Sequence, residues 1–205
     1  MELYVKYKSL VEAVKTDFFG EGSGHDWSHI ERVIHLALQL QQLEGGNKEL
    51  IFLAALTHDV GDHKFHNGDY TVGPKLCRAL LEKHKIASNL IEEILHITSN
   101  LSYSKGAPTF DSIEGKIVQD ADRLDAMGHL GIARCFAYGG NKNRPIYSST
   151  DPANSLQHFD DKLLKLLNLL NTNAAQKIGQ ERHAVMQNFK EGFLKEWNIA
   201  LEHAN

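Results

Sequence analysis

Seven consecutive apolar residues, Leu50 to Leu56, constrain the fold of this chain more than any other feature of its sequence. A run without polar interruption is typical of a helix that is buried on all sides. Asn47 follows two glycines and precedes the run, so its side chain can cap the start of such a helix. The run ends at Thr57-His58-Asp59, which places polar side chains at the core end of the predicted helix.

The remainder of the chain shows the spacing of amphipathic helices. Apolar residues recur at helical intervals, and the sequence lacks the series of short alternating segments that would indicate a sheet. These patterns predict an all-α fold. We expect Gly139-Gly140 to end one helix and residues 139–155 to form a long loop. Besides the helix after Asn47, the predicted helices cover residues 26–43, 75–83, 88–98, 113–127, 130–138, 155–170 and 180–202.

Size and charge limit the classes of protein to consider. A chain of 205 residues with 42% hydrophobic content is long enough for one sizeable core. We expect a single domain, residues 1–205, in which a core of about 20–138 carries the motifs and residues of about 155–203 form a C-terminal helical extension. The net charge of −4 argues against stable binding to nucleic acid. No segment approaches the ~20 apolar residues of a membrane span or resembles a signal peptide, so we expect a cytoplasmic protein without membrane contact.

Several histidines and aspartates could form a metal site. Asp59, at the end of a buried helix beside His58, needs a cation or several hydrogen bonds to offset its loss of solvation. His29 lies on the preceding predicted helix and Asp122 on a later one, so three helices could bring two imidazoles and two carboxylates to one ion. Such a site suits Mn, Fe, Co, Ni, Zn or Mg and leaves positions open for water and substrate. Alternatively, each histidine could be an ordinary surface or core residue, and Asp122 could pair with Arg123.

The order of these residues, a histidine, then a His-Asp pair, then an aspartate, resembles the HD superfamily of metal-dependent phosphohydrolases. The segments GHDWSHIERV, AALTHDVGD, DADRLDAMG and GIARCFAYGG are similar to the small bacterial HD-domain hydrolases of the YedJ and YpgQ type. This resemblance implies a compact HD-domain helical bundle with C-terminal helices docked on the core. It also implies one divalent metal ion, for which we expect Mn or Mg ahead of Fe, Co, Ni and Zn. The implied metal ligands are His29, His58, Asp59 and Asp122.

Asp62 is the predicted catalytic residue. It occupies the position, three residues after Asp59, at which related phosphohydrolases carry a catalytic acid or base. It also falls one helical turn beyond His58, so it can lie near the attacking water without binding the ion. The alternative is that Asp62 only stabilises the turn at Gly61. Phosphate recognition needs cations, which we expect among Lys64, Lys116, Arg123 and Arg144. We expect His25, Asp26 and Asp125 to cap or orient the site.

The resulting hypothesis is a metal-dependent phosphohydrolase that acts on nucleotides or related phosphate esters and anhydrides, as a pyrophosphohydrolase or a phosphodiesterase. Its partner would be a phosphorylated small molecule, and a homodimer through the C-terminal helices is an alternative to their packing on the core. Two other functions stay open, an HD-fold di-iron oxygenase and a non-catalytic metal-binding ligand sensor. The oxygenase would need further histidine ligands, for which the sequence offers His63, His66, His84 and His96.

Overall fold

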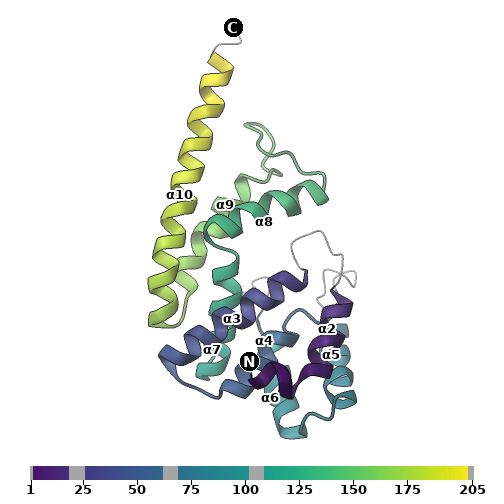
Figure 1. The fold of residues 1–205 in the computed structure, drawn as a ribbon. Helices are drawn as coiled ribbons and strands as arrows, with labels where there is room; N and C mark the ends of the chain where they lie inside the picture. The colour runs from purple at the N-terminus through teal and green to yellow at the C-terminus, as the bar shows by residue number, and fades with distance from the viewer. Residues whose placement is uncertain (1, 19–25, 62–68, 102–108, 203–205) are drawn as a thin grey trace. The chain divides into compact units, whose positions relative to one another are not determined.

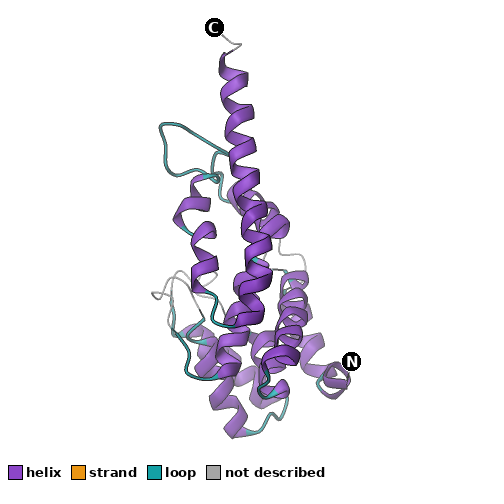
Figure 2. Cartoon of the chain, turned by 90° about the vertical axis from the view of Figure 1, so that its left-hand side faces the viewer, coloured by secondary structure: helices purple, strands orange, loops and turns teal. Residues whose placement is uncertain are grey.

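The computed structural model describes residues 2–18, 26–61, 69–101 and 109–202. Every regular element in these ranges is a helix, which confirms the predicted all-α class (Figure 2). None of the described helices is long and apolar enough to cross a membrane.

The chain divides into two compact units. The first contains residues 1–21 and 25–122, and the second contains residues 22–24 and 123–205. The boundary falls inside one helix, α7, Ile113–Asp125, so the last turn of this helix belongs to the second unit. The predicted single-domain organisation stays a prediction.

Helix α4, Lys48–Thr57, forms the centre of the first unit (Figure 1). Its residues from Leu50 to Thr57 are all buried, as the apolar run predicted. It packs against α3, Trp27–Glu44, and against α6, Ser88–Thr98. The other helices of this unit are α1, Glu2–Lys6, α2, Lys8–Asp17, and α5, Val72–Lys83, together with the first three turns of α7.

Asn47 caps α4, as predicted. Its side-chain oxygen accepts hydrogen bonds from the amides of Glu49, at 3.0 Å, and Leu50, at 3.2 Å. The amide of Asn47 donates in turn to the Glu114 carboxylate in the first turn of α7, at 2.8 Å. The start of α4 is thus fixed to the start of α7, and both helices carry predicted metal ligands near their other ends.

The second unit is built around α10, which packs against α8 and the 3₁₀ helix η3. Aromatic rings fill the space between its helices: Phe159 stacks on Phe189 of α10 at 5.8 Å between ring centroids, and Phe136 of α8 meets the Phe189 ring at the same separation. These aromatic contacts hold the helices that carry Phe136, Phe159 and Phe189 together. The helices of this unit are α8, Gly128–Asn141, α9, Gln157–Asp161, η3, Leu163–Leu169, and α10, Asn173–Glu202.

Three expectations about helix boundaries were wrong. Gly139-Gly140 do not end α8, which continues through them to Asn141. Gly139 is instead a packing position, because a β-carbon there would lie 2.0 Å from the Ser155 hydroxyl oxygen. Residues 155–170 form α9 and η3 instead of one continuous helix, and α10 begins at Asn173 instead of near residue 180.

Candidate metal centre

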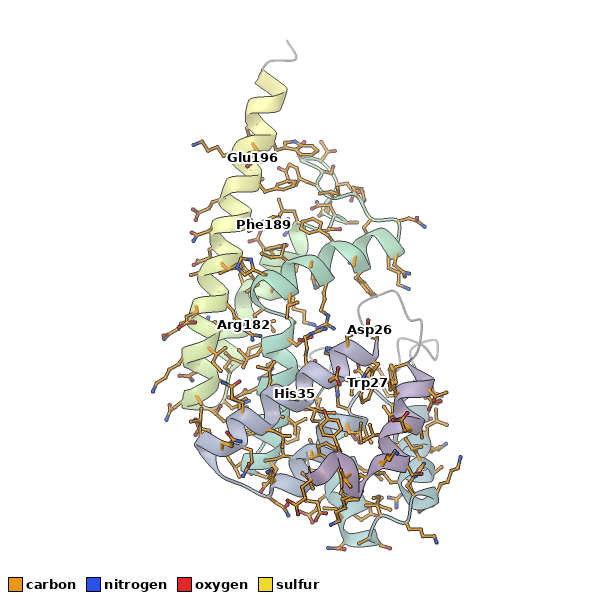
Figure 3. All side chains as sticks on the ribbon, viewed as in Figure 1. Asp26, Trp27, His35, Arg182, Phe189 and Glu196 are labelled. Carbon is orange, nitrogen blue, oxygen red and sulfur yellow. The ribbon has the colours of Figure 1, made fainter. Side chains whose placement is uncertain are left out.

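His29 lies in the first turn of α3 and is completely buried. Asp26 precedes this helix as its cap, and its side-chain oxygen accepts a hydrogen bond from the His29 amide at 3.0 Å. Figure 3 marks Asp26 at the start of α3. This cap holds the backbone that carries His29. That Asp26 orients the site stays a prediction, and His25 lies outside the described residues.

His58 and Asp59 follow directly at the end of α4, where the His58 backbone keeps helical angles, φ −62° and ψ −32°. The Nδ1 atom of His58 lies 2.8 Å from the Ala55 carbonyl oxygen. Because a carbonyl can only accept, this contact assigns the proton to Nδ1 and leaves the lone pair of Nε2 free to bind a cation. Metal-binding histidines in proteins are commonly oriented by such a bond.

The structure brings three of the four predicted ligands, His29, His58 and Asp59, into one cluster and places Asp122 beside its two histidines. His29 Nε2 lies 3.2 Å from His58 Nε2, 3.5 Å from Asp59 Oδ2 and 3.6 Å from Asp122 Oδ1. His58 Nε2 lies 3.6 Å from Asp59 Oδ1 and 3.9 Å from Asp122 Oδ1. The first three side chains are almost fully shielded from solvent, whereas the Asp122 side chain is 38% exposed.

This arrangement of donor atoms fits a divalent cation. Two imidazole nitrogens and two carboxylates converge in a space that is largely closed to water, which is costly unless positive charge lies between them. When an octahedral ion binds its ligand atoms at ~2.1 Å, neighbouring ligand atoms lie ~3.0 Å from one another. The distances from His29 Nε2 to the nearest atoms of His58, Asp59 and Asp122 are only slightly longer, at 3.2, 3.5 and 3.6 Å. One ion could therefore contact His29, His58 and Asp59, whose possible ligand atoms all lie within 4.8 Å of one another, and Asp122 lies beside the two histidines of this cluster.

Two of the histidines that could hold a second metal have other neighbours. The Nδ1 atom of His84 lies 3.1 Å from the Ser9 hydroxyl, and the His96 ring packs edge-on against Phe110. Within the part of the chain that the structure describes, the cluster of potential metal ligands includes neither. His63 and His66 lie outside the described residues.

The structure describes three of the four predicted phosphate-binding cations, Lys116, Arg123 and Arg144, each in its own surroundings. Lys116 precedes Asp122 by six residues on α7, one and two-thirds turns, so the two side chains leave the helix on different faces. Arg123 donates a hydrogen bond to the Leu169 carbonyl within the second unit. Arg144 also belongs to that unit, with its guanidinium 5.6 Å from the Tyr138 ring centroid. Lys64 and the predicted catalytic Asp62 lie outside the described residues.

Asp125 takes part in an ion pair that the sequence did not suggest. This carboxylate is completely buried, and its Oδ2 atom lies 2.8 Å from Nη1 of Arg134 on α8. Arg182 of α10 donates to the nearby Leu124 carbonyl at 2.5 Å. Burial lowers the pKa of Arg182, and the negative charge of Asp125 opposes that shift. Arg134 and Arg182 were missed because no motif or helical spacing connects either of them with the predicted site.

Comparison with known proteins identifies the family of this chain. The HD domain model matches residues 26–127. YpgQ, an uncharacterised protein of Bacillus subtilis strain 168, is 36% identical over 187 residues, which cover 89% of this chain and 87% of YpgQ. The chain therefore belongs to the HD domain family, as its motifs indicated.

Solved structures agree with this assignment. An HD-superfamily hydrolase from Bacillus thuringiensis is 45% identical with a TM-score of 0.77, over 96% of this chain and 98% of that one. The crystal structure of B. subtilis YpgQ in complex with ADP matches at 34% identity and a TM-score of 0.76, over 91% of this chain and 97% of YpgQ. The fold, the candidate metal centre and these relatives place the protein among the HD-superfamily hydrolases.

Proposed function

We propose that the protein is a divalent-metal-dependent phosphohydrolase that acts on nucleotides. The observation that carries the proposal is the convergence of His29, His58, Asp59 and Asp122 on one small, mostly buried space. The nucleotide is supported by the ADP complex of YpgQ, a relative that spans nearly the whole chain. Mn²⁺ or Mg²⁺ is the proposed ion, because carboxylate oxygens and open positions for water suit both.

A divalent ion at this position would supply Lewis acidity, which would lower the pKa of a coordinated water toward neutrality and stabilise charge on the phosphate. The protein contributes the rest of the chemistry. The hydrogen bond from His58 Nδ1 to the Ala55 carbonyl leaves Nε2 available to an ion, and the carboxylates of Asp59 and Asp122 would balance the charge of that ion. Burial of His29 and Asp59 keeps the local dielectric low, which strengthens these interactions.

Asp62 is the proposed general base. It would accept the proton of the attacking water at its carboxylate and return it to the leaving group. Its position three residues after Asp59 supports this role. Lys64, Lys116, Arg123 and Arg144 remain the proposed phosphate-binding cations.

Phosphate or pyrophosphate release from a panel of nucleotides, with Mn²⁺ or Mg²⁺ added, tests this function. Wild-type protein should be compared with Asp59→Ala and Asp62→Ala, and with Glu93→Ala as a control that removes an exposed carboxylate from α6. We expect activity to disappear in both site variants, metal content to fall chiefly in Asp59→Ala, and the control to behave as wild type. Full metal occupancy without turnover of any nucleotide would instead favour a ligand sensor, and two iron atoms per chain would favour an oxygenase.

A further inference from the structure

The C-terminal turn of α7 is held by an unusual number of arginine contacts. Cations near the C-terminal end of a helix are favourable. The Leu124 carbonyl, one residue before α7 ends, accepts a hydrogen bond from the Met127 amide at 3.0 Å and a second one from Nη1 of Arg182 at 2.5 Å. Arg123, within the same turn, donates to the Leu169 carbonyl at the end of η3. Two guanidinium groups thus connect this turn to other parts of the second unit.

A buried ion pair adds a third connection. Asp125, the last residue of α7, is 0% exposed in its side chain, and Arg134, with 18%, donates to it from α8. A buried carboxylate is strongly destabilising without its partner, so this pair restricts where the end of α7 can lie. The Asp125 charge also acts on Arg182. Asp125 therefore interacts with cations from both α8 and α10.

Close packing leaves this turn little room to shift. Gly128, which begins α8, has a φ of +70°, and a β-carbon on it would lie 3.1 Å from Cγ of Arg182. The aliphatic part of Arg182 thus fills the space beside the chain reversal, while its guanidinium reaches Leu124. Gly131 lies even closer to the Ala126 backbone, because a β-carbon on Gly131 would lie 2.2 Å from the Ala126 carbonyl oxygen. The path from α7 into α8 is consequently held by the Arg182 side chain at Gly128 and by the Ala126 backbone at Gly131.

These contacts bear on the metal centre because Asp122 lies on the same uninterrupted helix, two residues before Leu124 and three before Asp125. We propose that Arg182, together with the Asp125–Arg134 pair, is a positioning residue for Asp122, and that it sets the metal affinity of the centre through the last turn of α7. This inference rests on the proposed metal-dependent function. The alternative is that Arg182 only stabilises the second unit.

Binding of Mn²⁺ to the full-length protein separates the two possibilities. Free Mn²⁺ gives a sharp electron paramagnetic resonance signal, so titration yields the dissociation constant without any activity assay. Arg182→Met removes the donor and keeps the chain that packs on Gly128, and Arg182→Lys restores a cation. Phe159→Leu is the control, because this buried residue packs on Phe136 and Phe189 and should lower the stability of the same unit. Thermal unfolding of each apo variant measures that loss.

We expect Arg182→Met to weaken Mn²⁺ binding about tenfold, the lower end of the effect of removing groups that support a metal ligand. Arg182→Lys should recover part of this loss, and Phe159→Leu should bind as wild type despite its lower unfolding temperature. If Arg182→Met binds Mn²⁺ as wild type does, or if Phe159→Leu weakens binding equally, the positioning role is refuted. Wild-type protein that binds no Mn²⁺ would refute the metal centre itself.

A double-mutant cycle tests whether Arg182 acts through Asp122. In an Asp122→Asn background the carboxylate to be positioned is already absent, so Arg182→Met should cause no further loss of Mn²⁺ affinity. An equal additional loss in that background would show that Arg182 acts elsewhere, and would overturn the inference even if the single variant binds weakly.

Discussion

Gly61→Ala should damage both stability and the metal centre, because Gly61 ends the turn after His58 and Asp59. Its φ is +71°, a left-handed conformation that L side chains rarely adopt. A β-carbon on Gly61 would lie 2.6 Å from the Gly73 Cα atom, and one on Gly73 would lie 2.8 Å from the Gly61 carbonyl oxygen. Two backbone segments therefore touch here, and neither can yield by rotating a side chain.

The expected cost of this substitution follows from these contacts. The left-handed conformation costs an L residue ~1–2 kcal/mol, and overpacking against a backbone costs ~1–3 kcal/mol. Lower entropy of the unfolded chain offsets ~0.4–1 kcal/mol, which leaves a net loss of about 1–5 kcal/mol. For a chain of this length, that loss lowers the unfolding temperature by roughly 2–18 °C. Asp59 lies only two residues away, so Mn²⁺ affinity should fall as well.

Thermal unfolding and Mn²⁺ titration of Gly61→Ala measure both effects. Gly140→Ala is the matched control, since it lies in α8 and its β-carbon would meet no atom within 4 Å. It should be neutral or stabilise the protein by up to ~1 kcal/mol through higher helix propensity. If Gly61→Ala unfolds and binds Mn²⁺ as wild type does, the close approach of Gly61 and Gly73 is not a feature of the protein in solution.

Other properties can be tested independently. At a Mn²⁺ concentration one hundred times its dissociation constant, wild-type protein should gain ~2.7 kcal/mol in stability, whereas Asp59→Ala should show no Mn²⁺-dependent shift in unfolding temperature. Asn47→Ala should lose about 1 kcal/mol in urea unfolding and Asn47→Ser much less, because serine is also a good helix cap; equal stability of the two would argue against the cap. Burial raises the pKa of Cys135 to about 11, so its thiolate fraction at pH 8 is roughly two hundred times below that of an ordinary cysteine. Iodoacetamide should therefore modify Cys135 very slowly until the protein is unfolded, and rapid labelling of native protein would contradict this.

Helices with a strong periodic pattern were predictable from the sequence. The structure begins and ends α6 at Ser88 and Thr98, as predicted, and α4 follows its Asn47 cap. The short N-terminal helices were not predicted. Tyr4 of α1 and Tyr7, between α1 and α2, both pack on the Phe52 ring of α4, at 5.2 and 6.2 Å between ring centroids. Contacts that are remote in sequence stabilise such short helices, and local patterns do not contain them.

The two adjacent glycines in α8, Gly139 and Gly140, show a second feature that the sequence alone could not predict. Glycine costs a helix only ~1 kcal/mol relative to alanine, so two glycines weaken α8 without ending it. The Ser155 side chain occupies the space beside Gly139, and only glycine permits that contact. From the sequence alone, a glycine required by a distant neighbour looks the same as a glycine that ends a helix.

The three aspartates of α7 show which part of the site the sequence could predict and which part it could not. Asp120, Asp122 and Asp125 all lie on one helix, and the sequence offers more carboxylates than one ion needs. At ~100° per residue Asp120 points away from the other two, whereas Asp122 and Asp125 are only ~60° apart. In the structure Asp122 approaches His29 and Asp125 pairs with Arg134. The resemblance to the HD family identifies Asp122 as the candidate ligand, because the segment around it, DADRLDAMG, carries that resemblance. The partner of Asp125 comes from the next helix, so a chain could keep the motif, lose this partner and bind its metal less tightly.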